Sequence, residues 1–286
     1  MKEQIKKVVR ERYAKIVKQE SSCCGTIESS CGSSNSAHKI SKRIGYSDEE
    51  LKAVPEDSNL GLGCGNPVAF ASLGEGEVVL DLGSGAGFDC FLAANKVGKN
   101  GRVIGVDMTP EMIEKARENA KKGNCENVEF RLGEIENLPV ADNSVDVVIS
   151  NCVIVLSPDK RKVFSEAFRV LKPGGRLLIS DIVLLSQLPN FIKNSIEAYI
   201  GCVSGAISKN EYLREIRAAG FHDVKIINET SFAIEHITSS QTVSSIIDKF
   251  KIPPEKVKEI ASSVLSLRVL GLKPGEATSI KRKRLL

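Results

Sequence analysis

One stretch decides the fold of this chain: Asp81-Leu82-Gly83-Ser84-Gly85-Ala86-Gly87. The apolar run Val78–Leu82 leads into it, which is typical of a buried strand, and a segment with helical spacing follows. Glycines at such a strand-to-helix turn let backbone N–H groups and the helix N-terminus face a ligand with no side chain in between. The stretch therefore predicts a nucleotide-type loop in an α/β domain.

Size and charge limit what this loop can serve. With 286 residues and 42% hydrophobic content, the chain can bury a full core and hold one α/β domain with appended pieces. The formal net charge is +4, from 40 basic and 36 acidic side chains, which gives no strong field for nucleic acid. We therefore expect a small-molecule partner and no nucleic acid.

The sequence contains no apolar run of signal-peptide length and no stretch of about 18 apolar residues. Neither secretion nor a membrane partner is predicted, so we expect a cytoplasmic location. The eight cysteines would then stay reduced, as thiols available for soft ligands or redox reactions. A disulfide scaffold is disfavoured because a chain of this length folds without such links.

Apolar runs alternate with amphipathic segments through the middle of the chain, which predicts a parallel sheet covered on both faces. The runs are Val78–Leu82, Arg102–Asp107, Val128–Leu132, Val145–Asn151 and Arg176–Asp181. Two later strands, Val224–Ser231 and Ser266–Leu272, are expected to complete it, with helices near Asn190–Ile200 and Lys209–Ala219.

We predict three regions. Residues 1–66 form an N-terminal arm, with an amphipathic helix over residues 2–19 and a loop that contains cysteines. Residues 67–183 form the Rossmann-like, doubly wound cofactor domain, and residues 184–286 form a smaller α+β region and a tail. Within the arm, Ser47 and Glu50 match a capping box that opens a short helix.

Two further features narrow the kind of cofactor. Asp107 ends the second predicted strand about 20 residues past Gly87, where a carboxylate can accept both ribose hydroxyls. Gly133-Glu134-Ile135-Glu136 and Leu171-Lys172-Pro173-Gly174-Gly175-Arg176 flank the third and fifth predicted strands. Together these segments resemble the successive motifs of class I S-adenosylmethionine-dependent methyltransferases. The alternative is a redox Rossmann domain, because dinucleotide dehydrogenases use a similar glycine turn.

The resemblance implies a role for each matching position. Gly83, Ser84 and Gly85 would let the methionine moiety approach the backbone, with Asp81 supporting the loop. The ribose would lie on Asp107, and the adenine between Met108 on one side and Glu134 and Ile135 on the other. Asn151, at the end of the fourth strand, would point toward the sulfonium.

The expected site contains no histidine that could act as a base, and this bears on the identity of the methyl acceptor. Oxygen and nitrogen acceptors generally need a base, yet the histidines fall in no motif; they are His38, His222 and His236. The side chains expected at the active edge are instead thiols, namely Cys64, Cys152 and Cys202.

The runs around these thiols have a specific likeness. Asn59-Leu60-Gly61-Leu62-Gly63-Cys64-Gly65-Asn66-Pro67, Val106-Asp107-Met108-Thr109-Pro110 and Ile149-Ser150-Asn151-Cys152-Val153-Ile154 resemble the arsenite S-adenosylmethionine methyltransferases. This family implies that Cys64, Cys152 and Cys202 bind trivalent arsenic and that Cys23 or Cys24 adds a further thiol. It also implies methylation of arsenite to methyl- and dimethylarsenicals in arsenic detoxification, with thioredoxin or glutathione as reductant.

Physical chemistry agrees with such a substrate. Soft thiolates select soft metalloid ions, and three of them satisfy trigonal arsenic while leaving its lone pair free as the nucleophile, so no general base is needed. A structural zinc protein would show C-x-x-C pairs, and this sequence has none. The remaining alternative is a C- or O-methyltransferase acting on a lipid or quinone, which would tolerate loss of Cys152 and Cys202.

Overall fold

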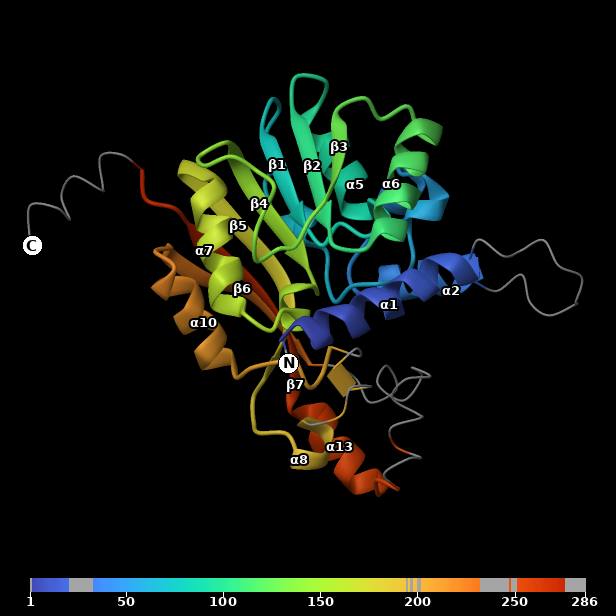
Figure 1. Ribbon diagram of the computed structural model, residues 1–286, viewed down its shortest axis with the longest axis vertical. Helices are drawn as coiled ribbons and strands as arrows, with labels where there is room; N and C mark the ends of the chain where they lie inside the picture. The colour runs from blue at the N-terminus through green and yellow to red at the C-terminus, as the bar shows by residue number, and fades with distance from the viewer. Residues whose placement is uncertain are drawn as a thin grey trace, which may run out of the picture.

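The computed structural model describes residues 2–20, 33–193, 195, 198–199, 202–231, 247 and 251–275. Its strands form one seven-stranded sheet in the order β3-β2-β1-β4-β5-β7-β6 (Figure 1). They are β1 Val78–Leu82, β2 Arg102–Asp107, β3 Val128–Leu132, β4 Val145–Asn151, β5 Leu171–Leu184, β6 His222–Ser231 and β7 Val264–Leu272.

The strand order places a ligand site next to the glycine loop. Strands β1 to β5 run parallel, whereas β7 runs antiparallel to both β5 and β6. The order reverses between β1 and β4, and open α/β sheets bind ligands outside the carboxyl ends of the strands at such a switch point. This architecture confirms the predicted Rossmann-like, doubly wound α/β sheet.

Helices cover both faces of the sheet, α5 and α6 on one and α7 and α10 on the other (Figure 1). The α-helices are α1 Lys2–Glu20, α2 Ser33–Arg43, α3 Asp48–Lys52, α4 Pro67–Phe70, α5 Phe88–Val97, α6 Pro110–Lys122, α7 Lys160–Val170, α8 Asn190–Lys193, α10 Lys209–Ala218 and α13 Pro254–Ser262. Two 3₁₀ helices complete them, η1 Glu56–Ser58 and η2 Ile154–Leu156.

Three apolar clusters hold these layers together. Two lie on the opposite faces of the sheet and include fully buried Leu80 and Phe164 on one face and Phe91 on the other. Burying one such side chain contributes about 1.5–3 kcal/mol. The third cluster lies at the sheet edge, where apolar side chains surround Cys64 and Cys202. Two of the predicted thiols therefore belong to a packed apolar region.

The N-terminal helix docks across the carboxyl edge of the sheet, as Figure 1 shows for α1. Its apolar side, which includes buried Val9 and Val17, packs inward, and α1 lies against α6. An ion pair between Lys18 Nζ and Glu111 of 2.9 Å links the two helices. The predicted helix over residues 2–19 is confirmed, and so is the capping box, because Ser47 and Glu50 exchange both of its hydrogen bonds.

The fifth strand is longer than predicted. Its first part, Lys172-Pro173-Gly174-Gly175, has the composition of a turn, yet β5 begins at Leu171. Leu171 pairs with Val145, and the register then shifts so that Arg176 pairs with Val147. The extra residues therefore form a bulge within the strand. Because β6 and β7 extend the same sheet, the division at residues 66 and 183 stays a prediction.

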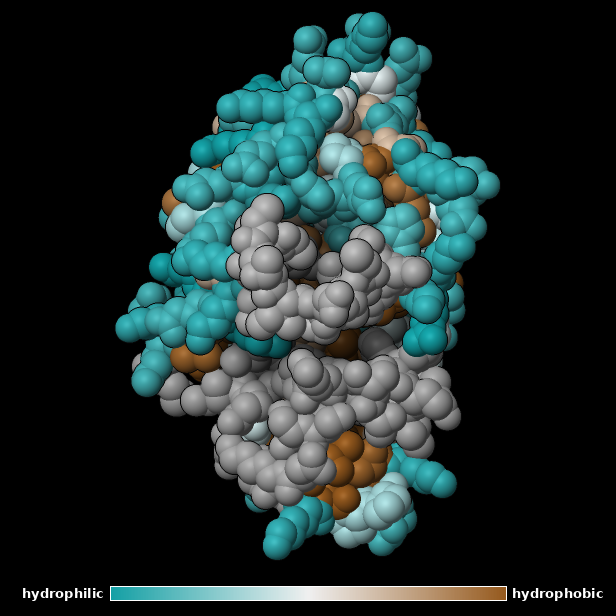
Figure 2. All heavy atoms as spheres, turned by 90° about the vertical axis from the view of Figure 1, so that its right-hand side faces the viewer, coloured by the Kyte–Doolittle hydropathy of each residue, from teal (hydrophilic) through white to brown (hydrophobic). Residues whose placement is uncertain are grey.

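The surface of the described part is mostly polar around the parallel strands. Figure 2 shows hydrophilic side chains over the upper part of the face on which α6 lies. Among the described residues, no helix combines the length and the apolar character needed to cross a bilayer.

Candidate active site

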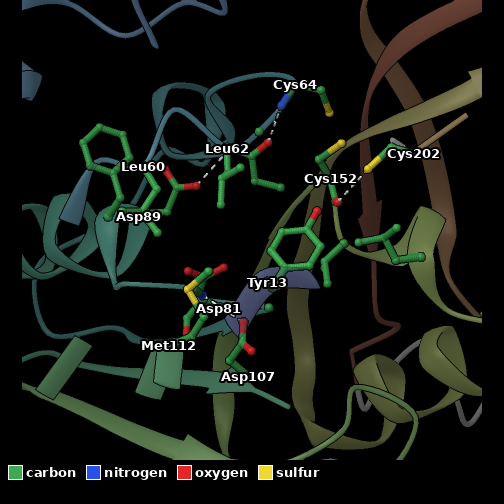
Figure 3. Close-up of a pocket in the computed structure, with 18 of the residues that line it drawn as sticks. Tyr13, Leu60, Leu62, Cys64, Asp81, Asp89, Asp107, Met112, Cys152 and Cys202 are labelled. Carbon is green, nitrogen blue, oxygen red and sulfur yellow. Dashed lines mark hydrogen bonds between the residues drawn. The ribbon is translucent and has the colours of Figure 1, made fainter. Parts of the chain in front are cut away.

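A cavity of about 650 Å³ opens at the carboxyl ends of the central strands. The cofactor loop, the end of β4, the turn around Cys64 and the inner side of α1 all line it (Figure 3). A volume of this size suits a ligand of cofactor dimensions, since such pockets span about 300–1,000 Å³.

The glycine loop is held tightly against the second strand. Gly83 N and Ser84 N both donate to Val106 O, at 2.8 and 3.0 Å. Gly83 has a φ of +67°, and a Cβ there would lie 2.3 Å from a methyl carbon of Val153. Gly87 has a φ of +96° and caps the N-terminus of α5. The loop therefore needs glycine for both its backbone shape and its close packing.

Asp107 ends β2 at the floor of this cavity. Its two carboxylate oxygens accept from Gly85 N at 3.0 Å and Thr109 N at 2.8 Å. Burial raises the pKa of Asp107, although these backbone bonds oppose the shift. The buried hydroxyl of Ser84 lies in the same cavity and has no hydrogen-bond partner in the described structure. Each group retains capacity to bind a polar ligand.

Two buried carboxylates face the same space. Asp81 lies next to the end of β1 and accepts from the Cys90 thiol at 3.3 Å, whereas Asp89 lies in the first turn of α5. Burial raises the pKa of Asp81 well above its usual range and that of Asp89 to about 6. No Lys or Arg of the described residues pairs with either of them. Buried carboxylates without a cation favour a positively charged ligand, since an unpaired buried charge is costly.

Cys152 and Cys202 both have left-handed backbones, with φ of +57° and +61°. This conformation is uncommon outside glycine, and such strained residues cluster at functional sites. The turn at Cys152 follows β4 directly and is fixed by its N–H, which donates to Ser180 O at 2.8 Å. Figure 3 shows the two sulfur atoms facing the same part of the cavity, with Tyr13 beside them.

Cys64 lines the same cavity as Cys152 and Cys202 but comes from the turn before α4. Its N–H donates to Asn151 Oδ1 at 3.0 Å, its carbonyl accepts from Ser266 Oγ at 2.7 Å, and its thiol donates to Ser180 O at 3.3 Å. The thiols interact, since hydrogen bonds with Cys202 and Cys64, followed by burial, raise the pKa of Cys152 well above its ordinary value. The structure therefore brings together three thiols that come from separate segments.

A carboxylate that sequence reasoning missed lies beside two of these thiols, Cys64 and Cys152. The ligand atoms of Cys64, Cys152 and Asp181 all lie within 4.8 Å of one another. Asp181 is buried and accepts from Tyr212 Oη at 2.8 Å and Val155 N at 2.9 Å. Burial raises its pKa to about 6. The one signal in the sequence was an acidic residue at the end of an apolar run, which was interpreted only as the end of a strand.

Tyr13 was also missed. It extends from α1 over the thiols, and its pKa is raised well above the usual range by burial first and then by the neighbouring Cys202. In the sequence Tyr13 falls within the amphipathic helix expected over residues 2–19, where nothing distinguishes it from a core residue.

The other predicted residues divide into two groups. Met108, Ile135 and Asn151 line the cavity together with the residues described above. Glu134 is not among the lining residues, and its carboxylate pairs instead with Lys6 Nζ at 2.6 Å. The contacts of each with a cofactor stay predictions. Cys23 and Cys24 lie outside the described residues.

Comparison with known proteins agrees with this geometry. The pattern of the methyltransferase domain family matches residues 73–220, about half of the chain. The chain belongs to this family. An arsenite methyltransferase from Halobacterium salinarum is 51% identical over 230 residues, which cover 78% of this chain and 59% of that protein. One from Aquipseudomonas alcaligenes is 41% identical over 187 residues, covering 63% and 54%.

A solved structure of this methyltransferase group has a similar shape. The arsenic(III) S-adenosylmethionine methyltransferase from Chlamydomonas reinhardtii is 33% identical, with a TM-score of 0.62 over 83% of this chain and 74% of that one. The resemblance to arsenite methyltransferases is thereby confirmed. The chain spans 52–62% of the length of the curated arsenite methyltransferases that it matches.

Proposed function

We propose that this methyltransferase transfers methyl groups from S-adenosylmethionine to trivalent arsenic bound by Cys64, Cys152 and Cys202. The observation that supports it most strongly is the convergence of three thiols at one end of a cofactor cavity, two of them with left-handed backbones. The relatives named arsenite methyltransferases agree with this assignment.

The cofactor half of the cavity suits S-adenosylmethionine. The loop at Gly83–Gly85 would hold the methionine moiety, and Asp107 the ribose. Buried Asp81 and Asp89 complement a cation, and the unpartnered Ser84 hydroxyl offers a further polar contact. When bound, S-adenosylmethionine supplies the methyl group as an electrophilic carbon on a sulfonium. The residues of this chain contribute position, charge complementarity and exclusion of water.

Arsenite capture is an exchange that balances without a separate base. Each step replaces one As–OH bond by one As–S bond, and the thiol proton leaves with the hydroxide as water. The pKa of Cys152 is raised well above its ordinary value by hydrogen bonds with Cys202 and Cys64 and by burial, so this exchange does not depend on a preformed thiolate at Cys152. Soft sulfur ligands favour arsenic, and three of them leave its lone pair available. The cavity lining in the described part of the chain contains no histidine, which agrees with a nucleophile that loses no proton.

The helix α1 isolates this site. Lys6, Val9 and Tyr13 form the inner surface that covers the cavity, and Lys6 fixes the helix through Glu134 and Glu136 at 2.6 and 3.5 Å. Excluding water strengthens electrostatic interactions inside and protects a reactive methyl donor from hydrolysis.

The remaining parts of the assignment concern electrons and products. Methylation formally oxidises arsenic by two electrons, and a pair of thiols supplies two electrons when it forms one disulfide. We propose Cys23 or Cys24 as a further thiol, thioredoxin or glutathione as the reductant, and methyl- and dimethylarsenicals as products.

Arsenic speciation tests this function. Reduced protein is mixed with arsenite, S-adenosylmethionine and glutathione, and the parent is compared with Cys152→Ser and Cys202→Ser. The matched control is Cys125→Ser, since Cys125 lies in a turn away from the cavity. We expect methylated arsenic from the parent and the control only. A parent that binds the cofactor but methylates no arsenic would contradict the proposal and favour a carbon or oxygen acceptor.

A further inference from the structure

The side chain of Asn151 lies at a junction between the two halves of the cavity. Its Oδ1 accepts from Cys64 N at 3.0 Å, and its Nδ2 donates to Gly65 O at 2.8 Å. The same Nδ2 lies 3.0 Å from Asp89 Oδ2 and 2.9 Å from Tyr46 Oη. Tyr46 in turn donates to Asp89 Oδ1 at 2.6 Å, within the buried interior. One amide therefore connects the thiol turn to the first turn of α5.

The thiol turn is shaped around this amide. Gly63 has a φ of +139°, and a Cβ on it would lie 2.9 Å from Asn151 Nδ2 and 3.1 Å from Oδ1. The N–H of Cys64 and the carbonyl of Gly65 are both hydrogen-bonded to this one side chain. Cys152 follows Asn151 in the chain, so a shift of Asn151 would move two of the three thiols.

At the α5 end of this hydrogen-bond connection, Asp89 lies in the part of the cavity proposed to bind the cofactor. Asp89 lies two residues past Gly87, which ends the glycine loop, and its carboxylate lines the cavity near Asp81 (Figure 3). A ligand that binds beside Asp89 restrains its carboxylate, and Asn151 Nδ2 lies 3.0 Å from Asp89 Oδ2. Ligand binding there therefore also restrains the Asn151 amide, which accepts from Cys64 N at 3.0 Å.

We propose that Asn151 is a positioning residue that couples cofactor binding to arsenite binding, so that each ligand tightens the site for the other. The proposal rests on the function proposed above and adds a role for Asn151 different from a contact with the sulfonium. Coupling between two binding sites is reciprocal and commonly amounts to about 5–150-fold in affinity.

The test measures arsenite affinity of the reduced full chain by titration calorimetry, with and without S-adenosylhomocysteine, which transfers no methyl group. In the parent we expect S-adenosylhomocysteine to tighten arsenite binding by about fivefold or more. In Asn151→Ala the ratio should fall to about 1. The matched control is Ser266→Ala, which removes the bond to Cys64 O but has no contact with α5. It should weaken arsenite binding equally in both conditions and keep the parental ratio.

If Asn151→Ala fails to fold, a second variant, Tyr46→Phe, still tests the coupling. Tyr46→Phe removes the hydroxyl between Asp89 and Asn151 but leaves the direct contact at 3.0 Å, so the ratio should fall at least twofold while the fold persists. A parental ratio of 1, or a full ratio in either network variant, overturns the coupling. A parent that binds no arsenite under either condition contradicts the proposed function instead, so the two failures are distinguishable.

Discussion

Replacing Gly63 by alanine tests whether the thiol turn depends on close packing against Asn151. Gly63 adopts a φ of +139°, and an added Cβ would lie 2.9–3.2 Å from three atoms of the amide. The amide cannot yield easily, because hydrogen bonds to Cys64, Gly65 and Asp89 hold it from different sides. The strained backbone costs about 1–3 kcal/mol. Overpacking adds about 1–3 kcal/mol.

These two costs predict a measurable loss of stability. A destabilisation of about 3 kcal/mol should lower the melting temperature of Gly63→Ala by about 6–12 °C, at about 2–4 °C per kcal/mol for a chain of this size. The matched control is Gly174→Ala, where φ is +81° and a Cβ meets no atom within 4 Å. It should lose only about 1–2 kcal/mol, the conformational part. Differential scanning calorimetry measures both.

Arsenite affinity provides the second measurement. Gly63→Ala should bind arsenite at least tenfold more weakly than the parent, about 1.4 kcal/mol, because a displaced turn moves the Cys64 thiol. Gly174→Ala should bind it as the parent does. Equal melting shifts in the two variants, together with unchanged arsenite affinity, would refute the packing argument.

Three further substitutions probe other parts of the site. Lys6→Ala removes the ion pair between α1 and Glu134, so the affinity for S-adenosylhomocysteine should fall several-fold. The control Lys7→Ala changes an exposed lysine and should leave this affinity unchanged. Equal affinities of the two variants would show that α1 is not needed for closure. Asp107→Ala should weaken cofactor binding about 10–100-fold, or about 1.5–3 kcal/mol. Its arsenite affinity in the absence of cofactor should not fall. An unchanged cofactor affinity, measured by calorimetry, would contradict the assignment of Asp107 to the ribose. Burial raises the pKa of Asp181 to about 6, so the native state loses stability between pH about 4, where an unfolded Asp ionises, and pH 6. Asp181→Asn should therefore gain stability relative to the parent as pH rises from 4 to 6, by up to about 3 kcal/mol, and a pH-independent difference in urea unfolding would exclude this cause.

Much of the fold was predictable because local patterns agreed with the final contacts. The central strands, the N-terminal helix and the capping box at Ser47 occur at or close to the expected positions. The bulge that begins β5 was not predictable, because Pro173 and Gly174 have the local signature of a turn and only pairing with β4 makes them part of a strand. The antiparallel direction of β7 likewise depends on its neighbours and not on its own residues.

The candidate site divides in the same way. The glycine loop was predicted from its glycines between a strand and a helix, and the three cysteines were predicted from their place at the active edge and from runs that resemble arsenite methyltransferases. Asp181 and Tyr13 were missed, since an acid at a strand end and an aromatic residue on a helical face are common features of any α/β protein. The role of Asn151 as a hydrogen-bond junction was also out of reach, because its partners come from three separate segments, at Tyr46, at Cys64–Gly65 and at Asp89.

The sequence by itself determined the α/β class and the glycine loop and pointed to three thiols as candidate arsenic ligands, because glycine conformation and thiol chemistry are properties of single residues. Tertiary structure alone decided that Cys64, Cys152 and Cys202 meet beside the loop, that α1 covers them and that one amide joins the two halves. The physical reason is that hydrogen bonds between distant segments and the dielectric of a buried site depend on the whole packed sheet, which no local pattern specifies.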